Sequence, residues 1–157
     1  GSPEAWRDLL QSVEAACEIA ERQDILLGVE PELANVVSDA RQALRLMREL
    51  GSDRIRIVLD PANLFETATL EDQRRLISDS IGLLGEHIAM AHAKDRASDG
   101  SFAAAGTGVV DFRHFLACLA AVGFDGPLIT HGLTAKEAPG VARFLGETLA
   151  GLGLGAS

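Results

Sequence analysis

Hydrophobic residues alternate between two patterns along this chain. In five segments, apolar side chains recur every three or four residues, as on one face of an α-helix. These predicted helices cover residues 3–23, 38–50, 70–85, 111–121 and 136–149. Between them stand short, continuously apolar runs, which are typical of strands covered on both faces. These predicted strands cover residues 25–29, 55–59, 88–91 and 128–130.

Residues at the ends of the predicted helices support these boundaries. Pro3 fits the first turn of the first helix, where its missing N–H costs nothing. Ser38 is the expected N-cap of the second helix, and Gly51 is its expected stop. Asp111 is expected to cap the fourth helix.

The element order is one helix followed by four strand–helix units. Alternating units with short connections predict parallel strands joined by right-handed crossovers. The longest predicted loop, residues 94–110, carries Asp99-Gly100 and Gly106-Thr107-Gly108 and is long enough to suggest a function. Two architectures fit this order: an open parallel sheet, and an arc of a (β/α)8 barrel.

Each predicted strand leads into a residue of a type that binds metal ions: Glu30, Asp60, His92 and His131. Successive strand ends rarely converge in an open sheet, whereas a barrel brings them all to one mouth. We therefore favour the barrel arc, with these four residues around one divalent cation. Mixed oxygen and nitrogen ligands suit Mn, Co, Zn or Mg without choosing among them.

Composition narrows the class of protein. The 157 residues suit one domain, residues 1–157. No apolar run approaches the about 18 residues of a membrane span, and no charged-then-apolar leader opens the sequence. We expect a cytoplasmic protein, and Cys17 and Cys118 are expected to be structural thiols of a reducing compartment. The net charge of -9 disfavours a nucleic-acid partner.

The two ends of the chain are expected to lie outside the folded unit. Gly1-Ser2 is typical of what remains after cleavage of an expression tag. The glycine-rich residues 151–157 are predicted to form a flexible tail.

Four motifs resemble those in the C-terminal half of the xylose isomerase-like TIM barrels, the sugar phosphate isomerase/epimerase family. This family is related to tagatose/psicose 3-epimerases and, more distantly, to endonuclease IV. The motifs match in order, and the resemblance runs over nearly the whole chain. They are Gly28-Val29-Glu30-Pro31-Glu32, Leu59-Asp60-Pro61-Ala62-Asn63, Ala91-His92-Ala93-Lys94-Asp95 and Gly106-Thr107-Gly108-Val109-Val110-Asp111-Phe112.

The resemblance implies a metal-dependent sugar or sugar-phosphate isomerase or epimerase that works through an enediolate. It places the metal on Glu30, Asp60, His92 and His131, and makes Glu30 and His131 the two groups that remove and return the proton. The epimerases have Glu at the fourth position, where this chain has His131. Histidine can serve both as a base at neutral pH and as a ligand, but the exchange removes one negative charge.

Neighbouring polar residues are candidates for substrate binding. Asn35 and Asn63 can hydrogen-bond a sugar or a metal ligand, although asparagine is also common in turns. Lys94 can meet a phosphate or a sugar hydroxyl, or simply pair with Asp95, which is a candidate itself.

The family barrel has eight strands and about 250 residues, so this chain matches half of it. A half-barrel leaves the strands 25–29 and 128–130 as open edges and exposes the barrel interior. Either the rest of the barrel was removed, or two copies meet edge to edge as a homodimer. The alternative function is that of a catalytically inactive metal-binding or scaffold fragment of such a barrel. A hydrolase acting on DNA is a third reading, which the acidic charge opposes.

Overall fold

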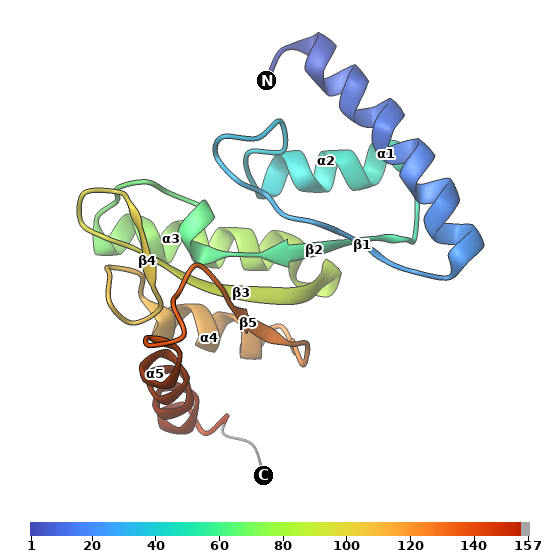
Figure 1. Ribbon diagram of the computed structural model, residues 1–157. Helices are drawn as coiled ribbons and strands as arrows, with labels where there is room; N and C mark the ends of the chain where they lie inside the picture. Colours follow the sequence, from blue (N-terminus) through green and yellow to red (C-terminus); the bar gives the residue numbers. More distant parts are fainter. Residues whose placement is uncertain (155–157) are drawn as a thin grey trace.

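Five α-helices and a five-stranded, mostly parallel sheet make up the computed structural model, which describes residues 1–154 (Figure 1). Short 3-10 turns follow β2 and α3 as η1 (Pro61–Asn63) and η2 (Gly85–His87). The helices and strands are α1 (Pro3–Gln23), β1 (Leu27–Val29), α2 (Ala40–Leu50), β2 (Ile55–Leu59), α3 (Leu70–Leu84), β3 (Ile88–Arg96), β4 (Phe102–Ala104), α4 (Phe112–Ala121), β5 (Leu128–Thr130) and α5 (Ala138–Gly151).

Four parallel strands stand side by side in the order in which the chain makes them, β1-β2-β3-β5. The helices follow one another in the same order, from α1 to α5, each contacting the next (Figure 1). Consecutive parallel strands with a helix after each are the arrangement of a TIM-barrel arc. The predicted half-barrel of parallel strand–helix units is therefore confirmed.

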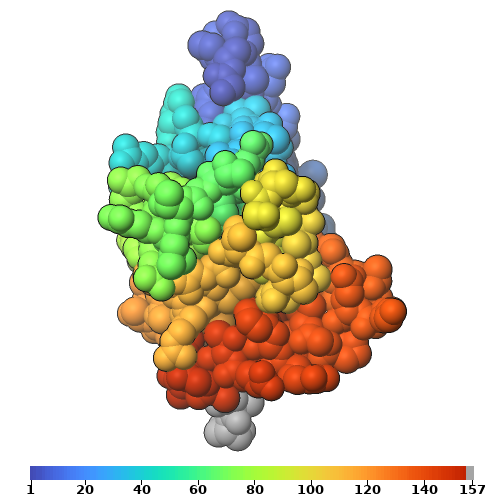
Figure 2. Space-filling view, turned by 90° about the vertical axis from the view of Figure 1, so that its left-hand side faces the viewer, coloured from blue at the N-terminus to red at the C-terminus, as the bar shows by residue number. Residues whose placement is uncertain are grey.

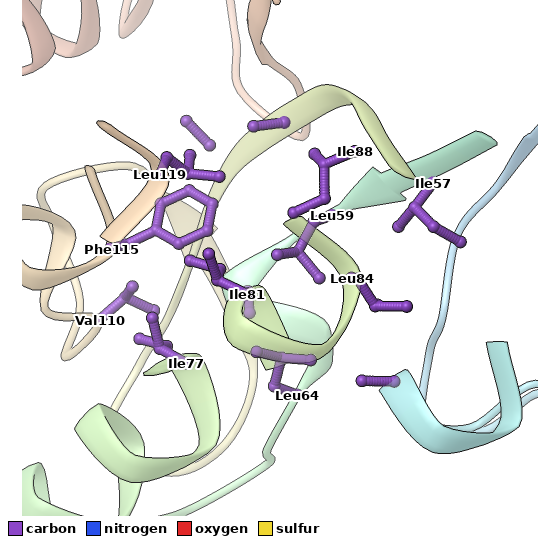
Figure 3. Packing of buried hydrophobic residues seen from close by; sticks show 14 of the residues in the cluster. Ile57, Leu59, Leu64, Ile77, Ile81, Leu84, Ile88, Val110, Phe115 and Leu119 are labelled. Carbon is purple, nitrogen blue, oxygen red and sulfur yellow. The ribbon is translucent and has the colours of Figure 1, made fainter. Parts of the chain in front are cut away.

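The hydrophobic core lies between the sheet and the helices. Every second residue of β2, namely Ile55, Ile57 and Leu59, is fully buried on this side. Ile81 of α3 and Phe115 of α4 pack into the same cluster (Figure 3). Burying each such side chain contributes about 1.5–3 kcal/mol, so this layer is a main source of the fold's stability.

The opposite face of the sheet is the one that would line a barrel. Val58 of β2 is half-buried on this face, and Ile129 of β5 is 42% exposed. Among the described residues, β1 pairs only with β2, and β5 pairs only with β3 in the parallel sheet. Both outer edges are thus open, as a half-barrel predicts.

The first strand is shorter than its apolar run predicts. Asp24 ends α1 in the left-handed region, with φ 52°, and the N–H of Ile25 donates to the carbonyl of Ala20. Ile25 belongs to this helix cap, and strand pairing begins only at Leu27. Ile25 and Leu26 are therefore 49% and 54% exposed. The predicted strand 25–29 is therefore corrected to 27–29.

Helix caps show a second small difference. Asp39, and not Ser38, is the N-cap of α2, because its Oδ1 accepts from the backbone N–H of Gln42 at 2.9 Å. Gly51 ends the same helix with φ 60°, as predicted. Ser2, interpreted as a tag remnant, accepts from the N–H of Ala5 and caps α1.

The largest difference from the prediction is at β3. The predicted strand 88–91 continues to Arg96, so His92 lies within the strand and not at its end. β4, missed in the predicted loop 94–110, pairs antiparallel with this extension, and Gly100 with φ 88° helps to turn the hairpin. The charged residues Lys94, Asp95 and Arg96 end the apolar pattern in the sequence, yet all three are buried in the structure. Figure 2 shows this hairpin in yellow, between the green segment after β2 and the orange-red C-terminal region.

The C-terminal region also differs from the prediction. α5 begins at Ala138, two residues later than predicted, and ends at Gly151. The N–H groups of Leu152, Gly153 and Leu154 donate to carbonyls of the last helical turn, so this part of the predicted tail is hydrogen-bonded. Residues 155–157 lie outside the described residues. None of the described helices is long and apolar enough to cross a membrane.

The core predicts a contrast between two positions of α3. Ile81→Ala should lower the free energy of unfolding by about 2–5 kcal/mol, because Ile81 is 1% exposed and the substitution leaves a cavity. Leu83→Ala, two residues away and 39% exposed, should change it by only about 0.5 kcal/mol. Urea denaturation followed by circular dichroism measures both values. Equal losses would show that the helix does not pack as described.

Candidate metal centre

Asp60 is positioned by the end of β2. Pro61 cannot continue the strand, and the chain turns into η1, whose N-cap is Asp60. Its Oδ1 accepts from the backbone N–H of Ala62 at 2.9 Å, which leaves Oδ2 to face the neighbouring strand ends. Asp60 therefore acts as a turn former with one oxygen and presents the other to the site.

The four predicted ligands come together. One donor atom from each of Glu30, Asp60, His92 and His131 lies within 4.8 Å of the others. His92 Nδ1 is 3.1 Å from Glu30 Oε1, and His131 Nε2 is 3.3 Å from Asp60 Oδ2. The two imidazole rings meet edge to face, with centroids 4.5 Å apart. The parallel register of β1, β2, β3 and β5 produces this convergence.

Electrostatics at the centre are dominated by the burial of Asp60. Its side chain is 0% exposed, and the lost hydration raises the pKa of the carboxyl above its usual value. The nearby Lys94 ammonium, the Ala62 N–H and His131 lower this pKa, while the charge of Glu30 raises it further. The net shift is upward, so the ionised form is held at a cost that a bound cation would offset.

The residues fit a divalent cation in both type and spacing. Ligands that share one ion are separated by at most about twice a 2.2 Å metal–oxygen bond, so the observed spread needs only small side-chain movements. Two carboxylates and two imidazoles would hold Mn, Co, Zn or Mg, and softer cations gain most from the nitrogen ligands.

Asn63 and Lys94 border this cluster. Asn63 is 1% exposed, and its Nδ2 donates to Glu30 Oε1 at 2.8 Å. Its Oδ1 accepts from Lys94 Nζ at 3.0 Å, and the same ammonium is 3.5 Å from Asp60 Oδ2. Lys94 therefore pairs with Asp60 and not with Asp95.

Asp95 and Asn35 are placed differently. The two oxygens of Asp95, which is 1% exposed, accept from the backbone N–H groups of Arg96, Gly106, Gly108 and Val110. The predicted substrate ligand Asp95 thus gathers the Gly106-Thr107-Gly108 loop around itself. Asn35 is exposed, and its side chain donates to Glu32. Neither belongs to the four-residue cluster.

Two residues near the site, Phe102 and Arg96, are not predicted from the sequence. Phe102 of β4 contacts two cations, because Lys94 Nζ and the Arg96 guanidinium are each 3.9 Å from its ring centroid. The every-second-residue spacing of Lys94 and Arg96, followed by the Asp99-Gly100 turn, is the signal of a hairpin that could have found them.

Comparison with known proteins agrees with this fold and cluster. The sequence profile of the family described as "Xylose isomerase-like TIM barrel" matches residues 1–145. The chain belongs to this family. No match was found among curated proteins.

Solved structures of the xylose isomerase-like fold superpose on the chain at low sequence identity. A xylose isomerase domain protein from Planctomyces limnophilus gives a TM-score of 0.77 at 20% identity, over 97% of this chain and 54% of its own. A D-tagatose 3-epimerase-like protein gives 0.75 at 21%, over 92% and 54%. D-Psicose 3-epimerase with D-tagatose, from Clostridium cellulolyticum, gives 0.71 at 15%, over 96% and 57%. The chain spans about half the length of each.

The raised pKa of Asp60 predicts a pH-dependent stability difference. Above its ordinary pKa the unfolded chain has released the proton that the native state retains more tightly, so stability falls as pH rises through this window. Asp60→Asn mimics the neutral form. Without added metal, the variant should unfold at higher urea than the parent at pH 8, and this advantage should fade below about pH 4.

Asp99→Asn is the control of opposite sign. Hydrogen bonds from Ser101 hold the pKa of the exposed Asp99 below its usual value, so its ionised form stabilises the fold. The variant should be slightly less stable at pH 8. Urea midpoints at pH 8 and pH 3.5, with a chelator present, measure both. A less stable Asp60→Asn at pH 8 would contradict the electrostatic account of the site.

Proposed function

We propose that the chain carries the metal centre of a sugar or sugar-phosphate isomerase or epimerase. The observation that carries this proposal is the convergence within 4.8 Å of four ligand-type residues from four parallel strands. Similar structures described as D-psicose and L-ribulose 3-epimerases support it. A bound divalent cation would polarise the carbonyl and hydroxyl oxygens of a hydroxyketone.

Glu30 and His131 are the proposed proton-transfer pair. They follow the two outermost parallel strands and flank Asp60 and His92 of the inner strands. Asn63 and His92 both approach Glu30 Oε1, and no protein partner reaches its Oε2 among the described residues. This free oxygen is suited to remove a proton next to the carbonyl, and His131, whose side chain is 40% exposed, is suited to return it through an enediolate.

His131 in place of glutamate changes the charge of the proposed centre. Imidazole titrates near neutral pH, so it is a competent acid or base. Because the ligand set carries one negative charge fewer, we propose that it favours Co or Zn over Mg. The proposed substrate is a small sugar in the cytoplasm, without a nucleic-acid or membrane partner.

The open sheet edges suggest how the site is completed. We propose that β1 of one copy pairs with β5 of a second copy, so that two half-barrels form a closed eight-stranded barrel. The exposure of Leu26 and Ile129 supports this, because closure would cover apolar surface and pair the free backbone groups of both edges.

A second candidate function is that of a metal-binding fragment without turnover. It is favoured by the share of the relatives that the chain spans, about half, and by the loss of one carboxylate at position 131. The two candidates differ in proton transfer and not in metal binding.

Deuterium exchange separates them. With Co²⁺ or Mn²⁺ in D2O, the chain should replace the C3 hydrogen of D-psicose, D-tagatose or L-ribulose with deuterium, as followed by proton NMR. Glu30→Gln should lower the exchange rate by at least about a hundredfold, because general-base catalysis contributes about 10²–10⁴. His131→Gln should act similarly. His87→Gln, which is outside the cluster, should leave the rate unchanged.

Metal titration and deuterium exchange together distinguish the two candidate functions. Cation binding without exchange for any sugar supports the inactive fragment and rejects catalysis. No binding of Mn²⁺, Co²⁺, Zn²⁺ or Mg²⁺ by calorimetry rejects both functions.

Self-association is tested separately by light scattering after gel filtration. The chain should elute with twice the mass of one copy, and Ile129→Lys should shift it toward the monomer by placing a charge on the face that closure buries. Glu147→Gln, at an exposed position on the outer helix α5, changes the net charge by the same one unit and is the control. A stable wild-type monomer at high concentration would contradict the closed dimer.

A further inference from the structure

Lys94 occupies an unusual place for a charged side chain. It is 8% exposed, although lysine is almost never buried unless it is paired. Its Nζ meets Asn63 Oδ1 at 3.0 Å, Asp60 Oδ2 at 3.5 Å and the Phe102 ring centroid at 3.9 Å. Lys94 therefore donates a hydrogen bond to Asn63, forms an ion pair with Asp60 and makes a cation–π contact with Phe102.

The surroundings keep this ammonium in place. The chain after β5 passes close to the Lys94 stem: a Cβ at Gly132, where φ is 70°, would be in ordinary van der Waals contact with Lys94 Cδ at 3.8 Å. Phe102 also contacts the Arg96 guanidinium, which donates to the carbonyls of Ala62 and Gly100. Lys94 is therefore enclosed between η1, the β3–β4 hairpin and the chain after β5.

One ammonium is connected to both carboxylates of the proposed centre. It contacts Asp60 directly, and it reaches Glu30 through Asn63, whose Nδ2 donates to Glu30 Oε1 at 2.8 Å. A cation in the cluster would bind the same Asp60 oxygen that faces Lys94. Like charges at such short range repel strongly where water is excluded.

We propose that Lys94 is a built-in counter-ion of the metal centre. It is a positioning residue: it holds the carboxylates of Asp60 and Glu30 in place before a metal binds, and it weakens the binding of that metal. This inference rests on the proposed metal function. It has a signature that a merely structural lysine lacks, because removing the charge destabilises the metal-free protein and tightens metal binding.

Lys94→Met tests this, since methionine keeps an unbranched stem and removes the charge. In calorimetric titrations with MnCl2 at pH 8, its Kd should be at least about tenfold lower than that of the parent chain. Its metal-free Tm should be several degrees lower. Lys94→Arg keeps the charge and should bind Mn²⁺ as weakly as the parent. Lys136→Met, a change at the chain's other lysine, which is exposed, should change neither quantity.

Phe102→Leu serves if Lys94→Met does not fold. Phe102 is 48% exposed, so its replacement is tolerated, and opening one side of the ammonium to water should screen its repulsion. The expected result is a two- to threefold lower Kd for Mn²⁺, which is about 0.4–0.7 kcal/mol.

The outcomes separate this inference from the function on which it rests. Equal or weaker Mn²⁺ binding by folded Lys94→Met, or by Phe102→Leu where that variant stands in, overturns the counter-ion role while leaving the metal centre intact. Absence of binding by the parent and by every Lys94 and Phe102 variant overturns both proposals.

Discussion

The site depends on keeping an ionised carboxylate where water cannot reach it. Asp60 follows Leu59 at the end of β2, and its side chain is 0% exposed, so water cannot hydrate it. A lone buried carboxylate would take up a proton instead of remaining charged. Its neighbours counter this with a backbone N–H from Ala62, an imidazole from His131 and the Lys94 ammonium. Fold and site meet at this one side chain, because the register that buries it also brings its partners to it.

The sequence predicts the elements that have a regular spacing of apolar residues. Four apolar runs and five periodic segments predicted the parallel strands and the helices, because burial on one or both faces leaves a direct record in the spacing of apolar residues. The convergence of Glu30, Asp60, His92 and His131 also followed, because parallel strands in chain order must bring their ends to one side. This inference needed no knowledge of any single contact.

The sequence does not predict the burial and the hydrogen-bond partners of individual polar residues. Lys94, Asp95 and Arg96 do not look like core residues, yet they are buried because each finds partners that are distant along the chain. The sequence pattern therefore predicts a loop where these residues form a hairpin. Asp95 is the clearest case: a carboxylate next to a predicted site suggested a substrate ligand, but its lone pairs are used by four backbone N–H groups. Hydrogen bonds from a loop backbone to one carboxylate leave no periodic pattern in the sequence, so a sequence pattern cannot predict them.

The chain-order pairing of strands and helices has a consequence for folding. Each strand–helix unit touches mainly the units before and after it, so the domain is built much as a repeat protein is, from nearest-neighbour interfaces. Such an array can grow or be shortened by whole units, with each addition needing only its neighbour. The four-residue cluster is the exception, because it joins the first unit to the last. An ion held there would act as a cross-link across the whole array, and would turn a sequence of local steps into one cooperative transition.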